Sequence, residues 1–232
     1  MLSKFTELVI PAGKRLTNFK SVLSKIIGYI KKHVTLSLSK FTGYWVSPVA
    51  EKVEAIKSTI IAEESKTQRL VISALLSAIA AILQAAGALG GPGFALSALV
   101  TLPIALATIL AVPTGIMAYI TTLCLLFVLQ PSEIIVFPFT TGLLGIGIGF
   151  AFRFLNKRVL VIAFAAFSLT VGVFLLLYVF KFPILGPSVS DDFNISMAGT
   201  IYAFALLYSW LWVEASMIFL KLLGKALKKS NS

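Results

Sequence analysis

The feature that most constrains the fold is a long run without charge: no Asp, Glu, Lys, Arg or His occurs from Leu70 to Ser132. About 20 apolar residues suffice for one helix to cross the hydrocarbon core of a bilayer, and this run is roughly three times that length. It must therefore fold back on itself inside the membrane. Its apolar residues are continuous rather than alternating, and a helix satisfies its own backbone hydrogen bonds in lipid. The sequence predicts an all-α membrane protein.

Glycine and proline divide this run into spans. The stretches GALGGPG (87–93) and VPTG (112–115) carry turn-forming residues, and three further apolar segments follow between charged or polar loops. The composition agrees, with 58% hydrophobic residues, 12% charged residues and a mean hydropathy of +0.97. We predict six transmembrane helices, at residues 68–88, 94–112, 114–131, 134–154, 159–180 and 196–220.

The basic residues predict the orientation of these helices. Of the 20 Lys and Arg residues, all but Lys181 precede or begin the first span, or lie in the loop 153–158 or in the tail after Leu220. In a six-span chain these segments share one side, which the positive-inside rule assigns to the cytoplasm. We therefore expect a multi-pass protein of the cell membrane with both termini cytoplasmic. The net charge of +11 follows from this asymmetry, and no nucleic-acid-binding motif accompanies it.

The segment before the first span differs in character. From Leu16 to Val34, apolar residues recur at helical spacing between lysines, which is typical of a basic amphipathic helix at an anionic membrane interface. A second helix is expected from Ser47-Pro48, a cap followed by proline. We divide the chain into a cytoplasmic amphipathic leader, residues 1–66, and a six-helix bundle, residues 67–232. The leader either packs beneath the bundle or docks a cytoplasmic partner.

Catalytic and metal-binding residues are scarce. The only histidine, His33, precedes the spans, the only cysteine is Cys124, and no aspartate lies within a span. An intramembrane aspartyl protease, a serine–histidine pair in the bundle and a His/Cys metal site are therefore excluded. We expect no enzymatic activity, no metal and no cofactor.

Glu214 is an ionisable residue within a predicted span, where charge is costly and usually faces a partner or a cavity. It lies near the cytoplasmic end of the last span. Arg153, at the cytoplasmic end of the fourth span, is expected at a similar depth. Glu214 either forms an ion pair with Arg153 that ties two helices together, or couples to a proton or a partner.

Small residues mark two helices. In the first span Ala74, Ala78, Ala81 and Ala85 share one helical face, whereas Ile72, Leu76, Ile79 and Leu83 share the opposite one. In the fourth span Gly142, Gly145 and Gly149 lie on one side. Helices in lipid associate by close packing, which small residues permit. The alanine face therefore packs either inside the bundle or against a separate protein.

These features resemble the substrate-binding S component of energy-coupling factor transporters. In that family an Ala-x-x-x-Ala pattern in the first transmembrane helix contacts the transmembrane coupling protein, and Ala74/Ala78 and Ala81/Ala85 match it. The segment FPFTTGLLGIGIGFAFRF (137–154) also looks like the fourth-to-fifth-helix region of the family. The long leader, and an outer half without dense polar groups, depart from the family pattern.

The resemblance implies a subunit that captures a small molecule, such as a vitamin or a related compound, from outside the cell. A coupling membrane protein and two ATPase subunits would then drive its release inside, since this chain has no Walker-type Gly-Lys motif. The pocket is expected in the outer half, capped by the GALGGPG loop. Candidate substrate-binding residues, chosen by predicted depth, are Gln84, Glu133, Thr140, Tyr178, Asn194 and Tyr202.

Two functions of other classes remain open. The few polar residues in the outer half favour a non-catalytic membrane scaffold or assembly protein that uses its leader to bind lipids and recruit partners. A small proton-linked transporter would use Glu214, although a single carboxylate offers no relay. The alanine face and the glycine-rich fourth span favour the transporter subunit.

Overall fold

The computed structural model describes residues 42–49, 51, 53–55, 66–182 and 195–230. The chain divides into two compact units, Met1–Val46 and Ser47–Ser232, and the helical bundle belongs to the second. The amphipathic helix predicted at Leu16–Val34 falls outside the described residues, as does Asn194.

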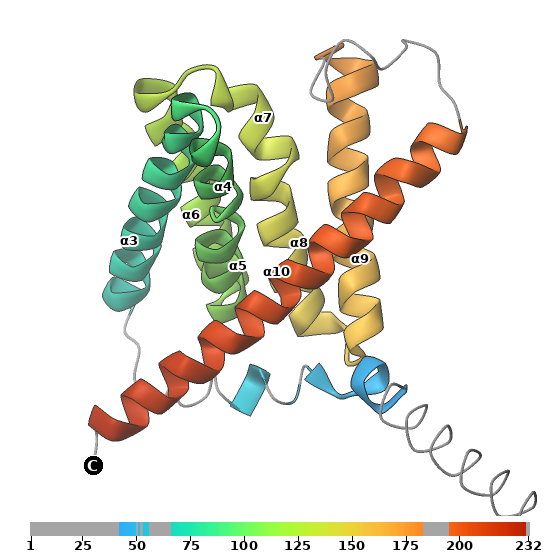
Figure 1. The fold of residues 1–232 in the computed structure, drawn as a ribbon. Helices are drawn as coiled ribbons and strands as arrows, with labels where there is room; N and C mark the ends of the chain where they lie inside the picture. The colour runs from blue at the N-terminus through green and yellow to red at the C-terminus, as the bar shows by residue number, and fades with distance from the viewer. Residues whose placement is uncertain (1–41, 50, 52, 56–65, 183–194, 231–232) are drawn as a thin grey trace, which may run out of the picture. The chain divides into compact units, whose positions relative to one another are not determined.

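Within the described residues, six segments are long and apolar enough to cross a membrane (Figure 1). They agree with the predicted spans to within a few residues, so the prediction of an all-α protein with six apolar spans is confirmed. The side of the membrane on which each terminus lies stays a prediction. The six segments are Lys66–Leu89, Pro92–Leu110, Val112–Leu129, Glu133–Phe154, Arg158–Val179 and Ile195–Lys225.

Several of the spans are interrupted helices. Pro138 lies inside the fourth span, and the helix breaks two residues later, at Thr140; proline removes a backbone donor and clashes with the preceding turn. The elements are α3 (Lys66–Ala85), the 3-10 turn η1 (Ala86–Leu89), α4 (Pro92–Ala98), α5 (Thr101–Leu110), α6 (Val112–Leu129), α7 (Glu133–Phe139), α8 (Thr141–Phe154), α9 (Arg158–Phe174), the π-helical turn η2 (Leu175–Val179) and α10 (Ile195–Ser230).

The turn between the first two spans depends on glycine. Gly90 and Gly91 have φ angles of +62° and +29°, which residues with a Cβ atom rarely adopt. Pro92 then occupies the start of α4, where its missing N–H costs nothing. The chain reverses within a few residues, which brings the end of α3 close to α4.

Helix α5 is the centre of the bundle. Nine of its ten residues are buried, and it contacts α3, α6, α8 and α10. Glycines on α8 allow a close approach to α5: a Cβ added to Gly145 would lie 2.8 Å from the Cβ of Ile104, and one added to Gly149 would collide with Thr108. The prediction that glycines of the fourth span permit close helix contact is confirmed.

The buried face of α3 differs from both faces predicted for it. The buried residues are Ser73, Ser77, Ala80, Ala81 and Gln84; they form a stripe that includes Ala81 of the alanine face and otherwise lies between that face and the leucine-isoleucine face. Serine is also small, and the Ser77 hydroxyl donates to the Ser73 carbonyl at 2.6 Å, so it packs without an unpaired donor.

The two predicted faces of α3 therefore flank this stripe. On the alanine side, Ala81 is buried, Ala78 and Ala85 are half-buried, and Ala74 is exposed. On the other side, Leu76 and Leu83 pack against the hydrophobic core. The sequence left open whether the alanine face packs inside the bundle, and the structure places the centre of the buried stripe at the serines beside that face.

A short segment before α3 packs with the bundle. The Val49 amide donates to the Asn156 carbonyl at 2.9 Å, and Val49 and Val53 are both buried. For these residues the structure shows packing against the α8–α9 loop. The sequence-based division at residues 66 and 67 thus separates this segment from the compact unit to which it belongs.

Candidate ligand-binding cavity

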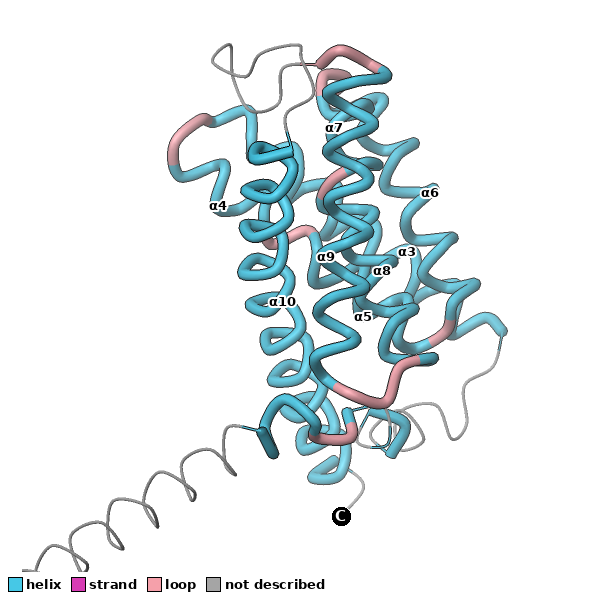
Figure 2. The backbone as a smooth tube through the Cα atoms, turned by 90° about the vertical axis from the view of Figure 1, so that its right-hand side faces the viewer, coloured by secondary structure: helices cyan, strands magenta, loops and turns pink. Residues whose placement is uncertain are grey.

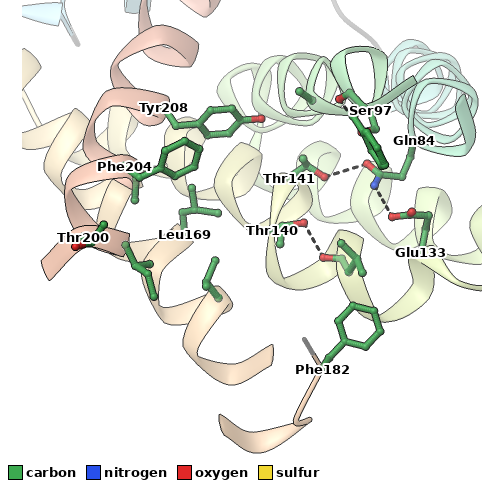
Figure 3. A pocket seen from close by; sticks show the side chains of 16 residues that line it. Gln84, Ser97, Glu133, Thr140, Thr141, Leu169, Phe182, Thr200, Phe204 and Tyr208 are labelled. Atoms are coloured by element: carbon green, nitrogen blue, oxygen red, sulfur yellow. Dashed lines mark hydrogen bonds between the residues drawn. The ribbon is translucent and has the colours of Figure 1, made fainter. Parts of the chain in front are cut away.

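A cavity of about 790 Å³ lies at one end of the bundle (Figure 3). It is lined by the last turn of α3, by α4, by the junction of α7 and α8, by α9 with Phe182 beyond it, and by the first turns of α10. This is the end at which α3 finishes and α10 begins, opposite the end that carries Lys66 and Arg153. The orientation predicted from basic residues would place the cavity on the outer side.

Gln84 and Glu133 form the most polar part of the wall. Gln84 is 3% exposed because it lies on the buried face of α3, and its Nε2 donates to Glu133 Oε2 at 2.8 Å. Thr141, the first residue of α8, donates from Oγ1 to Gln84 Oε1 at 3.0 Å. Glu133 begins α7, where the helix dipole favours a carboxylate. Three helices are thereby joined by one hydrogen-bonded chain (Figure 3).

Three other hydroxyl groups of the wall bond to their own helices. Thr140 donates to the Val136 carbonyl at 2.7 Å, Ser97 donates to the Phe94 carbonyl at 3.0 Å, and Thr200 donates to the Ser196 carbonyl at 3.0 Å. Such bonds to the preceding turn are how Ser and Thr satisfy their hydroxyl in a helix.

Helix α10 supplies an aromatic wall. Thr200, Phe204 and Tyr208 are spaced four residues apart, so they share one face of the helix, and the rings of Phe204 and Tyr208 stack with centroids 5.8 Å apart. The Tyr208 side chain lies near Thr101 and Trp212, whose buried Oγ1 and Nε1 have no hydrogen-bond partner among the described residues. Figure 2 shows α10 beside α9, the helix it contacts most.

The structure brings together half of the residues predicted for the pocket. Gln84, Glu133 and Thr140 line the cavity, whereas Tyr178 and Tyr202 do not. The GALGGPG loop, which was expected to cap the pocket, does not line it; the helix that follows the loop does. Four polar lining residues were not among the predicted candidates, namely Ser97, Thr141, Thr200 and Tyr208. The four-residue spacing of Thr200, Phe204 and Tyr208 is the signal that could have found the α10 wall.

The other intramembrane carboxylate lies elsewhere. Glu214 Oε1 is 3.1 Å from Arg158 Nη1, and the two side chains are 28% and 9% exposed. The predicted pairing with Arg153 is therefore wrong. Arg158 begins α9, which packs along α10, whereas Arg153 is exposed in the last turn of α8. The alternative in which Glu214 ties helices together is supported with a different partner.

Comparison with known proteins found no match: no protein-family model, no curated protein and no solved structure matches the chain. Within the described part of the chain, no group of three or more His, Cys, Asp or Glu could hold a metal ion.

Proposed function

We propose that this protein is the membrane-embedded substrate-capture subunit of an ATP-driven uptake transporter, similar to the S component of energy-coupling factor transporters. The observation that carries the proposal is the cavity of about 790 Å³ at the end of the bundle predicted to face outward. Its volume lies within the range of roughly 300–1,000 Å³ common for small-molecule sites. Its wall combines apolar surface with a few convergent polar groups.

The cavity weakens the scaffold alternative. That alternative was favoured because the outer half has few polar residues. Those few converge on one site: Gln84, Glu133 and Thr141 form a hydrogen-bonded chain on the cavity wall. Buried polar groups are costly unless they are satisfied, and a scaffold has no need to gather them around an open space.

The position of Glu214 weakens the proton-linked alternative. Glu214 pairs with Arg158 and does not line the cavity. A carboxylate that carries protons with a substrate is expected to face the substrate pathway. We therefore assign the Arg158–Glu214 pair a structural role, as a tie between α9 and α10.

The outer edge of α3 offers a surface for a coupling membrane protein. Ala74 is exposed, and Ala78 and Ala85 are half-buried, so part of this side of α3 remains accessible to another protein. A partner helix can approach small residues closely. We propose that the coupling protein packs on this surface, and that two ATPase subunits drive transport through it.

Leucine substitutions on α3 test the proposal. Ala74→Leu adds bulk on the exposed side, so it should leave the melting temperature unchanged while releasing the coupling protein and both ATPase subunits from the tagged chain purified in mild detergent. Ala81→Leu is the matched control, because Ala81 is 0% exposed. It should lower stability by about 1–3 kcal/mol through overpacking.

The result that would overturn the proposal is equally specific. If no ATPase subunit with Walker motifs purifies with the unaltered chain from its own cells, the transporter subunit is the wrong function. If Ala74→Leu keeps its partners, the coupling protein does not contact this side of α3.

A further inference from the structure

Three hydroxyl groups on the cavity wall already donate their hydrogen within the protein. A carbonyl oxygen cannot donate, so Ser97, Thr140 and Thr200 must each donate their hydroxyl hydrogen to the carbonyl of the preceding turn. What these hydroxyl groups leave for a ligand is their oxygen lone pairs. The wall thus offers acceptors at three positions and withholds the matching donors.

The Gln84 chain has a fixed direction for the same reason. An ionised Glu133 carboxylate can only accept, so it is the Gln84 Nε2 group that faces it, and the Gln84 Oε1 atom must face Thr141. Thr141 is then the donor to Gln84. Both hydrogen bonds of the chain are thus donated in the direction of Glu133. The chain ends in a carboxylate whose second oxygen, Oε1, receives no hydrogen bond from the described residues.

The charge and the aromatic rings of the cavity wall favour the same kind of ligand as its hydrogen-bond acceptors do, namely a positively charged donor. Among the described residues that line the cavity, Glu133 is the one charged group, and no Lys, Arg or His lines it. The opposite side presents aromatic rings, with Phe204 and Tyr208 of α10 in the wall (Figure 3). The faces of such rings attract cations, and a carboxylate at the edge of an apolar bundle attracts a positively charged partner.

We propose that the cavity binds a small molecule that carries a protonated amine or a comparable cationic donor on an apolar, ring-sized body. The cationic group would bind Glu133, and the body would lie against the aromatic side of α10. This inference names the substrate class of the same cavity and rests on the proposed function, although it can fail separately. An acid of the same size would meet acceptors and a negative charge, and should be rejected.

Three probes that share one aromatic body test the charge preference. The purified full-length chain in mild detergent is titrated with tryptamine, tryptophol and indole-3-acetate, which carry a cation, a neutral hydroxyl and an anion. Binding is measured as the rise in melting temperature and by calorimetry, since a ligand stabilises only the form that binds it. Tryptamine should bind at least about tenfold more tightly than tryptophol, as expected for one charge-assisted hydrogen bond. Indole-3-acetate should not bind.

Substitution of the carboxylate assigns the preference to the cavity. Glu133→Gln keeps the shape and an acceptor for Gln84 but removes the charge, so tryptamine should then bind no more tightly than tryptophol. Glu51→Gln is the matched control, because Glu51 is exposed and lies outside the cavity; it should keep the full preference. The melting temperature without probe shows that both variants fold.

Each other outcome counts against the inference. Equal binding of the three probes, preference for the acid, absence of any binding at millimolar concentration, or an unchanged preference in Glu133→Gln would each overturn it. Retention of the ATPase subunits by the unaltered chain in the same preparation would show that the proposed function survives such a failure. Loss of the subunits alongside selective binding of tryptamine would leave the ligand class standing without the transporter.

Discussion

Glu133 and Glu214 lie at opposite ends of the bundle, and their neighbours differ in charge. Glu214 is 3.1 Å from the guanidinium of Arg158, so the protein supplies its counter-charge. Glu133 receives an amide hydrogen from Gln84 and has no cation among the described residues around the cavity. A charge neutralised by its own chain is a structural element, whereas one held only by neutral donors retains the capacity to bind something else.

The largest expected effect concerns whether the two ends face opposite sides of the membrane. In a Cys124→Ser background, Ser132→Cys places a thiol beside the start of α7, and Lys157→Cys places one in the loop before α9; both positions are exposed. An impermeant thiol reagent applied to intact cells should label the first and leave the second unlabelled. Labelling of both to the same extent would show that the six-span orientation is wrong.

The next effect separates the two carboxylates by stability. Glu214→Gln leaves Arg158 buried without its counter-charge, which should lower the free energy of unfolding by about 3 kcal/mol, measured by denaturation in mild detergent. Addition of Arg158→Met should restore part of the loss. Arg153→Gln is the control and should stay within about 0.5 kcal/mol. A large loss of unfolding free energy in Arg153→Gln would show that Arg153, and not only Arg158, pairs with Glu214.

A smaller effect is expected where the cavity wall is held together by neutral hydrogen bonds. Thr141→Val leaves the buried Gln84 Oε1 without its donor, at a cost of about 1–3 kcal/mol. Thr140→Val is the matched control on the neighbouring residue. The Val136 carbonyl still accepts from the Thr140 amide, so that variant should lose less. Equal losses would mean that the Gln84 chain does not order the cavity.

The smallest effect is expected at Glu133 itself. In Glu133→Gln the new amide oxygen still accepts from Gln84, so the free energy of unfolding should change by less than about 1 kcal/mol. The same denaturation measurement applies as for Glu214→Gln. If the two carboxylates prove equally important for stability, the distinction between a structural and a ligand-binding carboxylate collapses.

The number and limits of the spans could be read from the sequence because membrane thickness sets their length and lipid forces their helicity. Depth along each helix was predictable for the same reason, which is why Gln84, Glu133 and Thr140 were found. The direction in which a side chain points was harder, because the spans are apolar on every side. Tyr178 and Tyr202 have suitable depth but do not line the cavity.

Two residues show what decides direction. Arg153 and Arg158 lie in the same short loop region, and only the packing of α9 along α10 places Arg158 beside Glu214. On α3, alanine is the residue expected to mark a close-packing face. Ser73 and Ser77 pack just as closely, because their hydroxyl groups donate to backbone carbonyls. Periodicity gives the faces of a helix, whereas the choice among them depends on neighbours that are distant in sequence.

The length of α10 links the cavity to the lipid around it. Its apolar part covers 31 residues, about 46 Å at ~1.5 Å per residue, whereas the hydrocarbon core measures about 30 Å. Such a helix fits by tilting, and Figure 1 shows α10 crossing the bundle obliquely. A thicker bilayer favours a more upright helix. Since Thr200, Phe204 and Tyr208 belong to the cavity wall, the acyl-chain length of the surrounding lipids becomes a variable that changes the width of the cavity.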